Sequence, residues 1–202
     1  MQHKNTIPYY IDLVPTSESR SIVVSGKAET IIPATSAAIC FTISSESASA
    51  DDAWRDMQQK EHAIMEEFAN SFSIPSSQFT MQEQMETQMN EEGSLLYIAH
   101  AMVTVCGVGV AQLPKAIDAG IHAGADAVEK IEYISMNFNE TYHRMLGLAM
   151  DRARAKAIAI ARADMERVGN VQTVSEQVQT ATIGNADGIP VAAEIVAVFA
   201  LA

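Results

Sequence analysis

The segment LLYIAHAMVTVCGV, residues 95–108, is the strongest strand signal in the chain and the best starting point for its fold. A turn signal, Glu91-Glu92-Gly93, comes just before it, and a polar segment at residues 78–88 comes before that turn. Two strand-length segments joined by a short turn are typical of a β-hairpin. The sequence therefore predicts antiparallel pairing at the centre of the chain.

Two further pairs of strands are expected on either side of this hairpin. On the N-terminal side, residues 22–31 form one strand that closes at Pro33, and a second strand follows with alternating apolar residues at Ala37, Ile39, Phe41 and Ile43. The short loop between them predicts another hairpin. On the C-terminal side, residues 171–179 and 191–201 form two strands around a loop that contains Gly184, Gly188 and Pro190.

Three helices are expected between the strand pairs. The first begins after Ser49 and ends at Ile74-Pro75, and the second begins at Pro114 and stops at Gly124. After a strand at residues 128–136, the longest helix covers residues 140–168, with Asn139 as its N-cap and Gly169 as its C-terminal stop. Its expected apolar stripe is Tyr142, Leu146, Ala149, Ala153, Ala157 and Ile160.

The order of these elements is ββα-ββα-βα-ββ. Hairpins dominate and helices are few, which favours an α+β fold with a mostly antiparallel sheet over a doubly wound parallel fold. A chain of 202 residues is long enough for one such domain, and 48% apolar residues argue against general disorder. We expect a single domain at residues 21–202, preceded by a flexible arm at residues 1–20.

The composition excludes some partners and compartments. With 13 Lys and Arg against 25 Asp and Glu, the formal charge is −12, so binding of nucleic acid through a basic surface is not expected. No apolar run approaches 18 residues, so no membrane-spanning helix is expected. The first ten residues lack the apolar core of a signal peptide, which predicts a cytoplasmic protein as written and a periplasmic one if a leader has been removed.

The long helix carries the one clear charge asymmetry. Residues 140–167 hold six Lys and Arg against four Asp and Glu, a formal charge of +2, which leaves −14 on the remainder. A basic helix on an acidic body predicts self-association into a homo-oligomer, through Arg144, Arg152, Arg154, Lys156 and Arg162. The alternative is a solvated helix face with local ion pairs, such as Asp151 with Arg154.

The motifs that could carry chemistry are weak. Gly107-Val108-Gly109 lies between a strand and a helix, but Gln112 stands where a dinucleotide-binding loop needs its third glycine. Met81, Met85 and Met89 share one face and predict either packing or, as an alternative function, a small-molecule or Cu(I) site. The five histidines show no ligand spacing. We therefore expect no catalytic, cofactor-binding or metal-binding residues, and a protein that is not an enzyme.

The two cysteines, Cys40 and Cys106, are both expected on the more polar face of their strands. If those strands are neighbours, the thiols could approach each other, and an oxidising compartment would bridge them. In a reducing compartment two separate thiols are expected.

The segment Val24-Ser25-Gly26-Lys27-Ala28-Glu29, followed by Pro33, resembles the opening strand of the SIMPL-domain family of bacterial proteins. Further similar segments follow in the same order over about residues 20–202: 103–105, 117–120, 123–125, 131–136, the helix residues 149–161 with Gly169, and 196–199. The helix segment, with Ala153-Arg154-Ala155-Lys156-Ala157, is the most specific. Two departures from the family are expected: the absence of a leader from the sequence as written, and Ala34-Thr35 in place of an acidic residue.

This resemblance implies an α+β domain that is often exported to the periplasm and that in some members assembles into large rings or channel-like oligomers. It also implies a link to stress tolerance and to cell-surface antigens. It implies no catalytic residues.

Overall fold

The computed structural model describes residues 20–177, 184–185 and 187–202, which fall into two compact units. Of these residues, the first unit takes 20–28, 146–177 and 193–202, and the second takes the rest. Strand β1 (Ser21–Ile32), helix α3 (Phe138–Ala163) and strand β7 (Ile189–Leu201) each contribute to both units. The assignment of residues 21–202 to one domain stays a prediction, and the arm predicted at residues 1–20 lies, apart from Arg20, outside the described residues.

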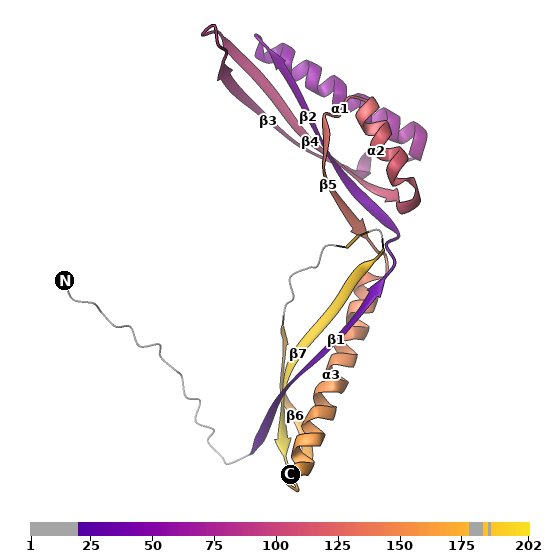
Figure 1. The fold of residues 1–202 in the computed structure, drawn as a ribbon, viewed down its shortest axis with the longest axis vertical. Coiled ribbons are helices and arrows are strands. Elements are labelled where there is room, and N and C mark those ends of the chain that lie inside the picture. Colours follow the sequence, from indigo (N-terminus) through magenta and orange to yellow (C-terminus); the bar gives the residue numbers. More distant parts are fainter. Residues whose placement is uncertain (1–19, 178–183, 186) are drawn as a thin grey trace, which may run out of the picture. The chain divides into compact units, whose positions relative to one another are not determined.

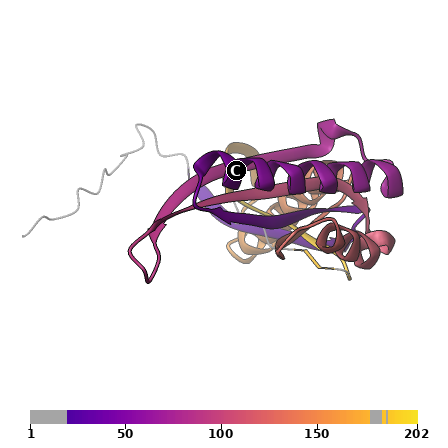
Figure 2. The same cartoon turned by 90° about the horizontal axis from the view of Figure 1, so that it is seen from above.

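The second unit is built on a four-stranded sheet with the strand order β3-β4-β2-β5 (Figure 1). Its strands are β2 (Ser36–Ser47), β3 (Phe79–Met89), β4 (Leu95–Gly109) and β5 (Ala127–Ile134), and each neighbouring pair is antiparallel. Helices α1 (Ala50–Phe72) and α2 (Leu113–His122) pack against β2 and β4, and α1 runs along the sheet (Figure 2). Short 3-10 turns at Ser76–Gln78 and Val110–Gln112 precede β3 and α2. The central hairpin is confirmed, since Phe79 to Met89 pair with Val105 to Leu95.

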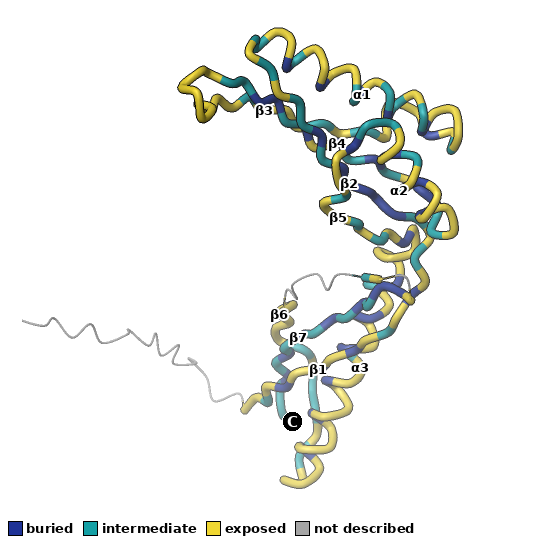
Figure 3. The backbone as a smooth tube through the Cα atoms, turned by 45° about the horizontal axis from the view of Figure 1, so that its top comes forward, coloured by how far each residue is buried: buried dark blue, intermediate teal, exposed yellow. Residues whose placement is uncertain are grey.

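The core of this unit follows from the two-residue period of its strands. Ile39, Phe41 and Ile43 of β2 are almost fully buried, together with Val103 and Val105 of β4. Figure 3 shows buried stretches along the strands of this sheet. They meet the helix residues Met57, Ile64 and Phe68 in one apolar cluster. Burial of one such side chain stabilises the fold by about 1.5–3 kcal/mol. This cluster draws only on residues 37–125, all within the second unit.

The first unit is a three-stranded sheet with the order β1-β7-β6 and the helix α3. Strand β6 (Val168–Gln177) is antiparallel to β7. The inward residues of β7, among them Ala197 and Phe199, are fully buried. The α+β class with mostly antiparallel sheets is thus confirmed, as are the predicted order and number of strands and helices in the described residues.

The predicted hairpin between the first two strands is wrong. β1 lies beside β7 in one sheet, whereas β2 lies between β4 and β5 in the other. The residues between them make no reverse turn, because the Thr35 N–H donates to the carbonyl oxygen of Ile134 at 2.8 Å and leads the chain onto β5. Pro33 has a fixed negative φ, and tight hairpin turns need residues with positive φ.

The predicted ends of the long helix are also wrong. α3 begins at Phe138, before Asn139, and ends at Ala163, before Gly169. Met165 takes the left-handed conformation (φ 58°), and the Glu166 N–H donates to the Ala161 carbonyl at 2.9 Å, a bond that closes a helix C-terminus. Gly169 instead belongs to β6.

Candidate functional site

Helix α3 meets the sheet of the first unit through a stripe of small residues. The buried residues of α3 within this unit are Ala149, Ala153, Ala157 and Ala161. The predicted stripe is confirmed at its alanines and wrong at Ile160, which is 54% exposed. Methyl side chains let the helix backbone come close to the strands, and Gly26 of β1 lies at the closest point. A Cβ atom there would overlap the Ala149 carbonyl oxygen and lie 2.8 Å from the Ala153 nitrogen.

Two basic side chains on one flank of the stripe fasten α3 to β1. Arg152 Nη1 donates to the carbonyl oxygen of Lys27 at 2.6 Å, and Lys156 Nζ donates to that of Ser25 at 2.8 Å. These carbonyls lie on either side of Gly26 in an edge strand, and unpaired edge carbonyls are the groups that recruit strands from other chains. Both residues belong to the set predicted to bind a partner, and in the structure both donate hydrogen bonds to backbone carbonyls of β1.

The other flank of the stripe forms what we call the arginine groove. Arg154, Ile158 and Arg162 follow one another at four-residue spacing on α3, on one side of the helix. They line a groove of about 470 Å³ together with Met165, Glu166, Arg167 and Val168. The groove therefore brings together two residues of the predicted set and a third arginine from the end of the helix.

The charges around the arginine groove are unevenly matched. Arg20 forms ion pairs with both nearby carboxylates, that of Asp164 at 3.1 Å and that of Glu166. The Arg154 guanidinium lies 5.5 Å from the centroid of the Phe199 ring and does not pair with Asp151. Within the described residues, none of the three guanidinium groups that line the groove has an ion-pair partner. The groove is thus a ready site for anionic groups.

The last residue of the predicted set, Arg144, belongs to the second unit. The five predicted residues are therefore not one surface: two fasten β1, two line the arginine groove and one lies in the other unit. Sequence spacing placed them on one helix, but the side of that helix depends on which stripe packs against the sheet.

A buried carboxyl group outside the predicted residues lies on the inner face of α1. Glu61 is 5% exposed, and within the described chain its Oε1 atom is buried without a hydrogen-bond partner. Its pKa is raised to about 7, first by burial and then by the negative charge and the hydrogen bonding of Glu83 on β3. The signal was present in the sequence, because residue 61 falls on the buried face of α1 between Met57 and Ile64.

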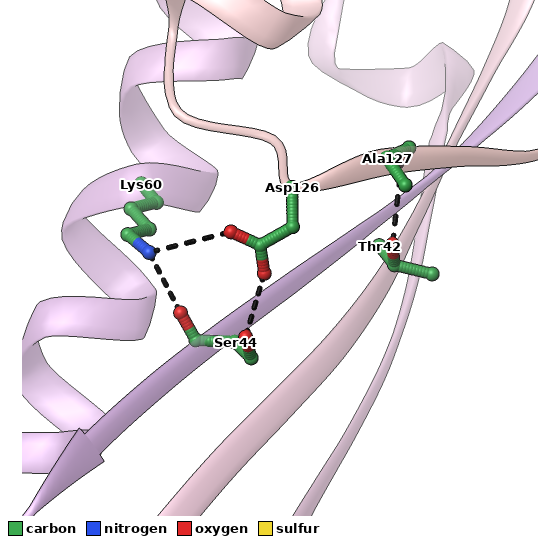
Figure 4. Close-up of polar contacts among 5 residues, drawn as sticks. All are labelled: Thr42, Ser44, Lys60, Asp126 and Ala127. Carbon is green, nitrogen blue, oxygen red and sulfur yellow. Dashed lines mark hydrogen bonds and ion pairs between the residues drawn. The ribbon is translucent and has the colours of Figure 1, made fainter.

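A second polar contact fixes the opposite side of α1 to the sheet (Figure 4). Lys60 Nζ donates to the Ser44 carbonyl at 2.6 Å and lies 3.8 Å from Oδ1 of Asp126. The Ser44 hydroxyl donates to the other oxygen of Asp126 at 2.7 Å. Thr42 adds a hydrogen bond of its hydroxyl to the Ala127 carbonyl. The polar groups of this cluster are hydrogen-bonded or ion-paired with one another. We therefore assign the cluster a structural role, in which it connects α1, β2 and the start of β5.

The glycine motif shapes a strand end. Gly107 has φ 85° and lies where the pairing of β2 with β4 shifts register, which is typical of a β-bulge. Gly109 precedes a 3-10 turn, and the Gln112 side chain lies 3.3 Å from where a Cβ of Gly109 would be. These two glycines serve the backbone geometry of β4, and Gln112 fills the space beside them.

The methionine face lies on the inner side of β3. Met81 and Met85 pack partly against the core, while Met89 is 68% exposed. Residues four apart on a strand are about 13 Å apart, too far for their thioethers to bind one ion together. The Cu(I) site stays a prediction, and the three thioethers on β3 are not placed to bind the same ion.

The two cysteines lie on neighbouring strands, β2 and β4. Cys40 pairs with Thr104, so Cys106 is two residues further along β4 on the same face. Both are free cysteines of intermediate exposure.

The described residues contain neither a metal-ligand cluster nor a helix that could span a membrane. No group of three or more His, Cys, Asp or Glu is placed to hold a metal ion in residues 20–177, 184–185 and 187–202. No helix in this part of the chain has the length and apolar character needed to span a bilayer.

Comparison with known protein families gives a match over most of the chain. Residues 22–197 match the family model SIMPL, described as a protein of unknown function (DUF541). No curated protein matches the chain. The matched range includes all three helices of the described structure and its strands, except the first residue of β1 and the last four residues of β7.

Proposed function

The chain belongs to the SIMPL family, a family of unknown function, and from that premise we propose that it is a non-enzymatic protein whose copies associate with one another through opposite charges. Any link to stress tolerance is part of this proposal and is assigned to no residue.

The observation that carries the proposal is the separation of charge between the two units. Among the described residues, the first unit has seven Lys and Arg against five Asp and Glu, a formal charge of +2. The second unit has five against 18, a formal charge of −13. Complementary surfaces of this kind favour contacts between the first unit of one copy and the second unit of another. Such head-to-tail contacts close into rings or continue as filaments.

The non-enzymatic part of the proposal is supported by the chemistry around Glu61. A general acid or base needs access to a substrate, and Glu61 is buried on the inner face of α1 between Met57 and Ile64. The arginine groove does not include it. The groove itself offers positive charge without a nucleophile, which suits binding better than catalysis.

The test is the mass of the native protein in solution at two salt concentrations, about 50 mM and 500 mM NaCl. At low salt we expect a multiple of the 21.8 kDa chain mass, and at high salt we expect dissociation, because the screening length falls from roughly 14 Å to 4 Å. A mass of 21.8 kDa at both concentrations contradicts self-association. A multimer whose mass does not depend on salt contradicts the charge mechanism alone.

A further inference from the structure

We propose that the arginine groove of one copy binds the acidic turn of a second copy, which we define as Glu91 and Glu92 at the tip of the β3–β4 hairpin. This rests on the proposed function, since it names the two surfaces through which the copies meet. The groove belongs to the positively charged unit and the acidic turn to the negatively charged one.

The arginine groove has the chemistry to bind two adjacent carboxylates. Three guanidinium groups line it, and each can give two parallel hydrogen bonds to one carboxylate. Glu166, the acidic residue in the lining, already pairs with Arg20. Apolar side chains complete the walls, including Ile158, which is 37% exposed, and Met165, which is 96% exposed. The groove therefore accepts a negatively charged segment with apolar neighbours.

The acidic turn is a segment of that kind. Glu91 and Glu92 are both exposed, and they are flanked by Met89 (68% exposed) and Leu95 (48% exposed) at the ends of the two strands. The charges of the turn thus match the arginines, and its apolar neighbours match Ile158 and Met165.

The turn is also held in one shape. The Asn90 side-chain oxygen accepts hydrogen bonds from the N–H groups of Glu92 (3.1 Å) and Ser94 (2.8 Å). The backbone of Asn90 and Ser94 closes the same loop at 2.9 Å, and Gly93 takes the positive φ that it requires (79°). A segment that is already ordered loses less conformational entropy on binding.

Four other exposed carboxylates of the second unit are already in ion pairs. Asp52 pairs with Arg55, Glu66 with His62, Asp126 with Lys60, and Glu132 with Lys130. Glu91 and Glu92 are adjacent, and neither has an ion-pair partner in the part of the chain that the structure describes. They are therefore the carboxylate pair most available to a second copy.

The experiment reverses the charge on each side of the contact separately. One variant carries E91K and E92K, and the other carries R162E and R167E; Arg154 is left unchanged because it covers Phe199. We expect each variant alone to show at least roughly tenfold weaker association in sedimentation at low salt, which corresponds to loss of about 1.4 kcal/mol. Mixed in equal amounts, the two should assemble, because each acidic or basic tip then meets a groove of opposite charge.

The matched control carries D118K and E129K, which changes the net charge of the second unit as much as E91K/E92K does but at other exposed sites. It should assemble much as the unaltered protein does. Circular dichroism establishes that each variant is folded, and R162Q/R167Q serves as the milder groove variant if charge reversal prevents folding.

The outcomes separate the two proposals. If the unaltered protein assembles and E91K/E92K assembles equally well, the acidic turn is not the contact, while self-association stands. If the two reversed variants do not recover assembly when mixed, the pairing of this turn with this groove is wrong. If the unaltered protein is 21.8 kDa at low salt, the proposed function itself fails.

Discussion

At Gly26 the absence of a side chain sets the distance between β1 and α3. The backbone of Ala149 and Ala153 occupies the space that a Cβ at this position needs. Two segments that resemble the SIMPL family, residues 24–29 and 149–161, therefore meet at this point, where the glycine of the first allows close approach of the second. Ser25-Gly26-Lys27 resembles part of a phosphate-binding loop in sequence. In the structure, however, Gly26 allows α3 to approach β1, and the carbonyl oxygens of Ser25 and Lys27 accept hydrogen bonds from Lys156 and Arg152.

Replacing Gly26 with alanine should destabilise the protein by about 3 kcal/mol, because the added methyl group meets helix backbone that cannot rotate away. The measurement is the free energy of unfolding in urea, followed by far-UV circular dichroism. Gly147 is the matched control, since it lies in α3 and has no atom within 4 Å of an added Cβ. G147A should stabilise the protein by up to about 1 kcal/mol through helix propensity. Equal effects of the two substitutions would contradict the close approach at Gly26.

At the scale of elements, the sequence indicated the strands and helices well because each has a clear period or boundary signal. The central hairpin was predictable from its turn, and the stripe of α3 from its alanines. What could not be read from local signals was pairing: Pro33 closes β1, but whether the chain then turns back or runs on depends on the bond from Thr35 to Ile134, 99 residues away. The helix end at Ala163 rests on Met165 in a conformation that glycine usually takes.

The candidate site was predictable only in part for a similar reason. The sequence placed Arg154 and Arg162 on a basic helix, but it predicted the same partner-binding role for Arg152 and Lys156. Residues two apart on a helix point about 200° apart, so the packing of the alanine stripe decides which side each residue joins. The turn at Glu91-Glu92 was predicted as a turn, while its match to the arginine groove needed the structure.

Glu61 of α1 should make the folded protein more stable at low pH than at high pH. Its pKa is about 7 in the folded protein against an ordinary value of 4.5, so the folded protein binds this proton more tightly than the unfolded chain. The contribution to stability is complete below pH 4.5 and is lost as the pH rises to about 7. Above pH 7 the cost is roughly 3 kcal/mol. E61Q should therefore remove this fall and be more stable than the unaltered protein at pH 8.

The measurement is the urea unfolding free energy of both proteins between pH 4 and pH 8. E83Q should remove a smaller part of the pH dependence, because Glu83 is the second cause of the raised pKa after burial. E129Q, a change to an exposed glutamate on β5, should leave the pH dependence as it is. Parallel pH profiles for the unaltered protein and E61Q would show that Glu61 does not titrate in this range.

For the whole molecule, the formal charge of −12 conceals two units of opposite sign. Counting along the long helix found the positive charge, but the unit that carries it also includes Arg20 and Lys27 from β1 and its approach. Folding gathers these residues from both ends of the chain into one unit. The positive charge therefore belongs to a unit of the fold and not to one continuous segment of the sequence.

The two units should also respond separately to destabilising substitutions. Trp54 is the single tryptophan and packs against the core of the second unit, to which only residues of that unit contribute. F68A, which removes a fully buried ring from that core, should cost about 3–5 kcal/mol and lower the urea midpoint of Trp54 fluorescence by roughly 1–2 M. G26A lies in the first unit and should leave the Trp54 midpoint unchanged. It should lower the urea midpoint only for the part of the circular dichroism change that comes from the first unit. If G26A shifts the Trp54 midpoint as far as F68A does, the two units unfold together, as expected for the single domain predicted at residues 21–202.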